Sequence, residues 1–142
     1  MTDEEIVHTK HAPPPVGAYP HARRAGELLF LSGIGPRPAA GDAIPGTETR
    51  ADGTVVTTDI EAQCHAVFSN VRAVLESAGA TMGDLVDVTV FLTDIERDFA
   101  VYNRVYAEYF SAGDGPCRTT VEVTRLPTPI AIELKCIARL SS

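Results

Sequence analysis

The chain is 142 residues long, with 44% hydrophobic residues and a formal net charge of −7. This composition fits one globular domain over residues 1–142, and the acidic charge disfavours a nucleic-acid partner, since such binding depends on clustered Lys and Arg. No apolar run reaches the roughly 18 residues of a membrane helix, and the N-terminus lacks a secretory-signal pattern, so we expect a cytoplasmic protein without a membrane partner.

Residues 1–16 are predicted to be an extended arm. The run Pro13-Pro14-Pro15 fixes φ and withholds backbone hydrogen-bond donors, which disfavours helix and inner strand. His8 and His11 lie in this arm without a third metal ligand nearby in the sequence. A solvated tail is therefore favoured over a metal site.

Two strands and a long loop are predicted to follow. Residues 17–24 and 27–33 form the strands, with a turn at Ala25-Gly26 between them; the second contains four consecutive apolar residues between turn signals. Residues 35–57 are rich in glycine and proline and predict an irregular loop. Loops of this length in a compact domain are usually functional or partly disordered.

A helix is predicted to begin at Thr58, which forms a capping box with Glu61. Gly79 supplies the left-handed residue that ends it. Apolar residues at spacings of three and four form one stripe along this helix: Ile60, Cys64, Val67, Val71, Val74 and Leu75.

A strand and a second helix are predicted next. Residues 84–93 alternate, and Val86, Val88, Val90 and Leu92 share the apolar face. Aromatic residues recur at helical spacing over 99–110, which predicts an amphipathic helix with its aromatic stripe in the core. Asn103 lies on or beside that stripe, and its amide needs hydrogen-bond partners if it is buried.

The last two predicted strands, 118–125 and 130–140, contain the two residues least typical of a scaffold. Arg118 shares the mixed face of the first strand, and Glu133 is a lone carboxylate opposite the apolar face of the second. The order of elements predicts an α+β protein, in which two helices cover one face of a mostly antiparallel sheet. The other face, with Phe91 and Ile137, is suited to a subunit interface.

The absence of the usual sequence motifs disfavours metal, nucleotide and serine-hydrolase chemistry. The sequence contains no P-loop, G-x-G-x-x-G, H-E-x-x-H or G-x-S-x-G motif, and its three cysteines form no C-x-x-C pair. The guanidinium of Arg118 can bind a carboxylate in bidentate fashion, and Glu133 can transfer protons if burial raises its pKa. A structural salt bridge of Arg118 with Glu133 or Glu122 is the alternative.

The distance between Arg118 and Glu133 along the strands bears on whether they form a salt bridge within one chain. If the last two strands pair symmetrically, Glu133 faces Glu122 and lies ~13 Å along the strand from Arg118. Either a substrate spans this gap, or Arg118 meets the Glu133 of a neighbouring subunit. Both arrangements favour a site at an interface over a salt bridge within one chain.

Several segments together carry a family resemblance: Gly17-Ala18-Tyr19, 29–33, 59–63, 90–94, 98–103, 116–123 and 126–127. In these segments the chain resembles the RidA (YjgF) family of enamine and imine deaminases. The resemblance implies a chorismate-mutase-like fold, a homotrimer with clefts between subunits, and no metal or organic cofactor. It also implies that Arg118 binds the substrate carboxylate and that Glu133 positions or activates water. The residues that match the cleft of the family are Tyr19, Ser32, Gly33, Asn103 and Thr120.

Departures from the common family pattern point to a subgroup. They are Ile34, Thr120 and the long 35–57 loop, while 20–26, 115–121 and 132–135 look most like 2-aminomuconate deaminases. That resemblance implies hydrolysis of 2-aminomuconate to 4-oxalocrotonate and ammonia in aromatic degradation.

A substrate with two carboxylates would benefit from a second cation, for which Arg24 and Arg37 are the candidates; surface arginines without a ligand are the alternative. Two other functions stay open. The protein could be a broad deaminase of 2-imino acids such as 2-aminoacrylate, or a non-catalytic trimer that binds a small carboxylate.

Overall fold

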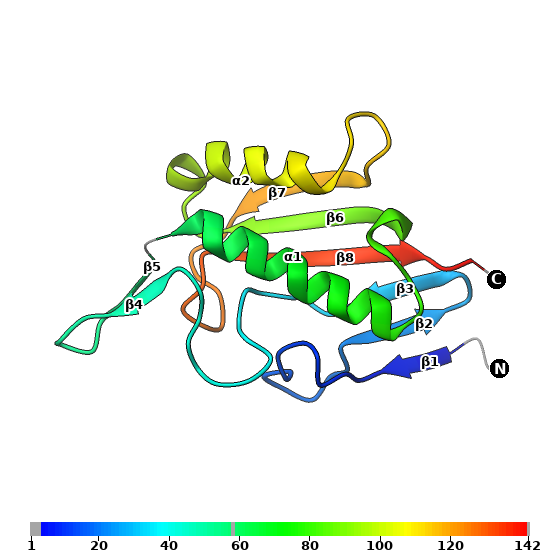
Figure 1. Ribbon diagram of the computed structural model, residues 1–142, viewed down its shortest axis with the longest axis horizontal. Helices are drawn as coiled ribbons and strands as arrows, with labels where there is room; N and C mark the ends of the chain where they lie inside the picture. The colour runs from blue at the N-terminus through cyan, green and yellow to red at the C-terminus, as the bar shows by residue number, and fades with distance from the viewer. Residues whose placement is uncertain (1–3, 58, 142) are drawn as a thin grey trace.

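The computed structural model describes residues 4–57 and 59–141 (Figure 1). Within them one sheet has the strand order β1-β2-β3-β8-β6-β7, and a separate hairpin is formed by β4 and β5. Both helices lie over one face of the sheet, so the predicted α+β class is confirmed. The elements are β1 (Glu4–Val7), β2 (Ala22–Ala25), β3 (Leu28–Leu31), β4 (Thr47–Thr49), β5 (Val55–Thr57), α1 (Ile60–Ser77), a 3-10 turn (Met82–Asp84), β6 (Leu85–Leu92), α2 (Ile95–Tyr109), β7 (Cys117–Glu122) and β8 (Ile132–Arg139).

The core lies between the helices and the sheet. Alternation along β8 buries every second side chain: Ile132, Leu134, Cys136 and Ala138. The predicted stripe of α1 is buried against them from Cys64 to Leu75. Burial of one such aliphatic side chain contributes roughly 1.5–3 kcal/mol, so packing rather than helix propensity stabilises α1. No helix in the described part of the chain is both long and apolar enough to cross a membrane.

Both ends of α1 are capped by hydrogen bonds, and the N-cap residue differs from the predicted one. Asp59 is the N-cap, and its carboxylate accepts a hydrogen bond from the Ala62 N–H at 3.0 Å. The predicted cap, Thr58, lies outside the described residues. At the other end Gly79 has φ of 78°, and the Ala80 N–H donates to the Leu75 carbonyl at 2.8 Å. The predicted glycine stop is therefore confirmed.

The symmetric pairing of the last two strands does not occur, because β6 lies between β7 and β8. Helix α2 carries the chain back, so that β7 runs parallel to β6 with Arg118 beside Val88 and Thr120 beside Val90. These two side chains therefore face the helices, and Val121 faces the open side. Alternation predicts the two faces of a strand but not its neighbours, so the sequence alone does not show that the face with Arg118 lies toward the helices.

Four further segments differ from the sequence prediction. The strand predicted over 17–24 is confined to β2, Ala22–Ala25. Part of the 1–16 arm is not a solvated tail, since β1 pairs with β2 and Val7 is buried. The 35–57 loop contains the β4–β5 hairpin, which projects beyond one end of the sheet in Figure 1. Val86 is exposed rather than on the apolar face, because the register with β8 shifts between Leu85 and Asp87.

Candidate functional site

Arg118 lies at the rim of the sheet on the edge strand β7. Its Nη1 donates a hydrogen bond to Asn103 Oδ1 at 2.9 Å. Its guanidinium carbon lies 5.2 Å from the ring centre of Tyr102 and 4.7 Å from that of Tyr106. Two aromatic faces and an amide thus hold the cation by cation–π attraction and one hydrogen bond. Among the described residues, no carboxylate forms an ion pair with it.

Of the predicted cleft residues, Asn103 binds this arginine and Thr120 lies on the same face of β7, two residues further along. Asn103 is exposed on α2 rather than buried, and its amide oxygen is used by Arg118. Thr120 Oγ1 lies 3.1 Å from the Tyr102 hydroxyl. Burial raises the pKa of Tyr106 to about 12, so its phenol stays protonated at neutral pH. The arginine is the charged group of this half of the site.

Glu133 lies on the opposite side of the sheet, beside Phe91 of β6. It is half-buried in a hollow, and no described residue donates a hydrogen bond to its carboxylate. Burial raises the pKa of Glu133, and the positive charge of Arg37 opposes this shift in part. A carboxyl group of raised pKa is suited to proton transfer near neutral pH.

The hollow around Glu133 is lined by Tyr19 and Gly33, which match the cleft of the family. It is also lined by Arg37, one of the two candidates for binding a second carboxylate. Gly33 allows a close approach: a Cβ at this position would lie 2.7 Å from Glu133 Oε2. Its lining is completed by Val16, Gly35, Pro127, Thr128 and Ile130.

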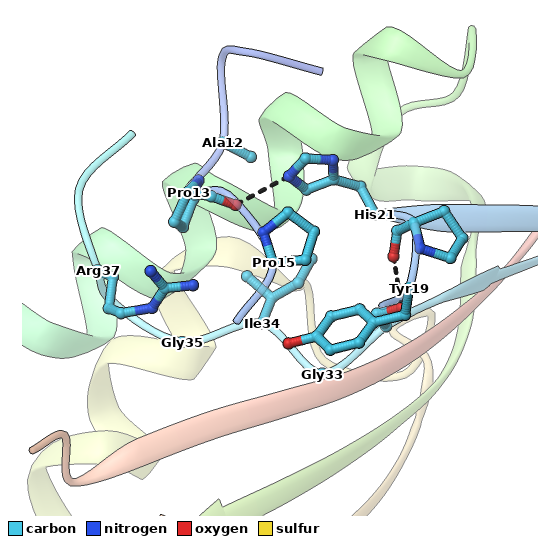
Figure 2. A pocket seen from close by; sticks show the side chains of 11 residues that line it. Ala12, Pro13, Pro15, Tyr19, His21, Gly33, Ile34, Gly35 and Arg37 are labelled. Atoms are coloured by element: carbon cyan, nitrogen blue, oxygen red, sulfur yellow. Dashed lines mark hydrogen bonds between the residues drawn. The ribbon is translucent and has the colours of Figure 1, made fainter. Parts of the chain in front are cut away.

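A second hollow, shown in Figure 2, shares Tyr19, Gly33, Gly35 and Arg37 with the first. It also contains Ser32, whose hydroxyl donates to the Pro20 carbonyl at 2.7 Å. This serine is therefore bound to backbone in the structure. The two hollows are thus neighbours, and Pro13 and Pro15 of the arm line the second one.

The two candidate second cations differ in position. Arg24 lies on β2, where its Nε donates to the Gly26 carbonyl at 2.8 Å across the tight turn, and it lines neither hollow. Arg37 lines both hollows. The structure thus brings Arg37, and not Arg24, close to Glu133.

Arg118 and Glu133 cannot meet within one chain. Arg118 is level with Val88 and faces the helices, whereas Glu133 is level with Phe91 and faces the open side. Glu122, the other partner considered for Arg118, accepts a hydrogen bond from the Ile95 N–H at 2.9 Å. Neither structural salt bridge considered for Arg118 forms.

Two buried polar residues that hold the hollow in place were not predicted from the sequence. The Thr9 N–H donates to His21 Nδ1 at 3.2 Å, and His21 Nε2 lies 2.8 Å from the Pro13 carbonyl, so the imidazole ties the arm to the residue that precedes β2. Asn70 of α1 donates to the carbonyls of Gly35 and Arg37, both at 2.8 Å. The sequence does contain a signal for Asn70, because a polar amide stands among the apolar residues of the stripe on α1.

The fold is that of a two-layer α+β protein, in which the two candidate site residues, Arg118 and Glu133, lie on opposite faces of the sheet. The sequence profile of the family described as Endoribonuclease L-PSP matches residues 9–140. A RutC family protein of Pyrococcus horikoshii is 40% identical over 136 residues, which cover 95% of this chain and 97% of that protein. The chain belongs to this family, and the predicted relation to RidA proteins is confirmed.

Two further relatives bear on function. Reactive Intermediate Deaminase A, chloroplastic, of Arabidopsis thaliana is 36% identical over 137 residues, covering 96% of this chain and 66% of that protein. The crystal structure of Escherichia coli TdcF with bound serine superposes with a TM-score of 0.81 at 32% identity, covering 96% of this chain and 99% of that chain.

Proposed function

We propose that this protein is a hydrolytic deaminase of enamine and imine carboxylates, acting at a site shared between two copies of the chain. The observation that carries this proposal is the position of two unpaired groups: among the described residues, Arg118 has no acidic partner on one side of the sheet and Glu133 has no hydrogen-bond donor on the other. A relative named as a reactive intermediate deaminase supports the reaction class, and bound serine in TdcF supports a carboxylate ligand.

Assembly would bring the two halves together. The open face of the sheet exposes Phe30 and Val121, and an apolar surface of this kind is suited to contact with another copy. We propose the homotrimer that the family resemblance implies, with Arg118 from one subunit opposite Glu133 from the next.

In the proposed mechanism Arg118 first binds the carboxylate next to the amino-bearing carbon. Its planar fork fixes the orientation of the substrate, and the Asn103 amide and the two tyrosine rings fix the fork. The enamine then tautomerises to the imine in a defined position. Such positioning removes much of the entropic part of the barrier.

Glu133 would then act on water. As the carboxylate it takes a proton from a water molecule while the oxygen attacks the imine carbon, giving a carbinolamine. As the acid it returns that proton to the nitrogen, which completes the neutral carbinolamine. Glu133 then passes the hydroxyl proton of the carbinolamine to the same nitrogen, the C–N bond breaks, and ammonia leaves as the C=O bond forms. One water is consumed per ammonia released. The raised pKa of Glu133 suits both roles.

The specific substrate that we propose is 2-aminomuconate, which would give 4-oxalocrotonate. Its conjugated carbon chain suits the apolar and flat lining provided by Tyr19, Pro127 and Ile130. The test is to generate 2-aminomuconate enzymatically, add the protein, and follow loss of substrate absorbance together with ammonia release. Failure to accelerate the spontaneous reaction would overturn this assignment.

Variants test the assigned roles in the same assay. Arg118→Ala and Glu133→Gln should each lower kcat/KM by about a hundredfold or more, the usual range for loss of an acid–base group or a charged anchor. Arg139→Ala serves as the control, because Arg139 is exposed and paired with Glu27 at 3.3 Å. Unchanged turnover in Glu133→Gln would exclude the proposed proton transfer.

Two other functions have support among the relatives. The name of the Arabidopsis relative favours a broad deaminase, which would process a 2-aminoacrylate-type imine as fast as 2-aminomuconate. The serine complex of TdcF favours a non-catalytic carboxylate binder, which would lose its ligand in Arg118→Ala while the wild type releases no ammonia. The family description names an endoribonuclease, but the net charge of −7 disfavours RNA as a substrate.

A further inference from the structure

Arg37 lies beside Glu133, the proposed water-handling group, and has no acidic partner in the part of the chain that the structure describes. One N–H of its Nη2 donates to the Pro14 carbonyl at 2.7 Å. No carboxylate of the described residues forms an ion pair with it, although its charge offsets part of the rise that burial causes in the pKa of Glu133. Because a guanidinium has five N–H donors, most of its capacity remains available to a ligand in the hollow.

The position of Arg37 is fixed from two sides. From below, the buried Asn70 amide donates to the carbonyls of Gly35 and Arg37 and so holds the backbone against α1. From above, the proline-rich arm receives the guanidinium at Pro14, and Figure 2 shows the side chain directed toward this arm. A cation held in this way loses little entropy when it binds an anion.

We propose that Arg37 binds a second carboxylate of the substrate, so that the site selects conjugated dicarboxylates over monocarboxylates. This inference rests on the proposed function, and it assigns one carboxylate to Arg118 and the other to Arg37. Both arginines lack a carboxylate partner within the described residues, and each belongs to a different half of the site. The carbon chain would lie between them, with its reacting carbon near Glu133.

Binding of two unreactive probes separates this inference from catalysis. Hexa-2,4-dienedioate and hexa-2,4-dienoate share one diene and differ only in the second carboxylate. Isothermal titration should show that the wild type binds the dicarboxylate at least about tenfold more tightly, as expected for a charge-assisted hydrogen bond. Arg37→Ala should remove this preference and leave monocarboxylate binding within about twofold. Arg37→Lys should retain part of the preference, because it keeps the charge but loses the fork.

Arg50→Ala is the matched control, since Arg50 is exposed on the same 35–57 loop and lines neither hollow. It should bind both probes as the wild type does. Equal wild-type affinity for the two probes would overturn the inference, and so would an equal loss of both in Arg37→Ala. These readouts need no turnover, so a protein that releases no ammonia would contradict the proposed function and still test Arg37.

Discussion

Asn70→Ala is expected to release the loop segment that carries Arg37. The substitution removes two hydrogen bonds of 2.8 Å, to the carbonyls of Gly35 and Arg37. Each bond contributes about 1 kcal/mol net, and carbonyls left without a donor add to the cost, so unfolding free energy should fall by about 2–4 kcal/mol. For a chain of this size that loss corresponds to a decrease in Tm of roughly 6–12 °C.

The assay is urea unfolding at one fixed protein concentration, because assembly makes apparent stability concentration-dependent. Ser69→Ala is the control, since Ser69 is the exposed neighbour on the same helix. The preference for the dienedioate over the dienoate should fall together with stability. A loss below about 0.5 kcal/mol would refute the hydrogen-bond account. If the free energy of unfolding falls by the expected amount and the preference for the dienedioate is unchanged, Asn70 stabilises the fold but does not fix the position of Arg37.

Two further predictions concern Glu133. Folding raises its pKa by burial, so the contribution of this carboxyl is present at acid pH and is lost as pH rises through the folded-state pKa. Glu133→Gln should therefore stabilise the protein at about pH 8 but not at about pH 4, as measured by urea unfolding; an equal effect at both would contradict this. Gly33→Ala should lower kcat by about tenfold or more, because the new Cβ would lie 2.7 Å from Glu133 Oε2. Gly83→Ala, whose Cβ would lie 3.6 Å from Thr81 Oγ1, should leave kcat unchanged.

Local patterns predict the elements of this fold well. Strict alternation over 130–140 predicts the buried face of β8, and spacings of three and four predict the buried stripe of α1. The start of α1 differs by one residue, because Asp59 and Thr58 are both good caps and the sequence alone does not distinguish them. Elements held by their own periodicity are thus predictable.

Strand neighbours are not predictable in the same way, because pairing depends on contacts that are distant in sequence. Nothing local in 118–125 specifies that β6 lies between β7 and β8, or that Arg118 faces α2. The N-terminal strand is missed because prolines dominate the pattern of the arm, although Val7 is buried. Of the two candidate second cations, only the folded loop distinguishes Arg37, held by Asn70 and Pro14, from Arg24.

The placement of Arg118 and Glu133 on opposite faces of one sheet has a genetic consequence. In the shared site that we propose, each chain lends its arginine to one cleft and its glutamate to another. A chain whose Arg118 is replaced leaves incomplete the cleft to which a neighbouring chain contributes Glu133. When mutant and wild-type chains assemble together, some clefts that contain a wild-type Glu133 are therefore inactive. The same chain still contributes an intact Glu133 to its other cleft. Two alleles that are each inactive alone, one lacking the arginine and one lacking the glutamate, therefore contain between them the parts of one intact cleft.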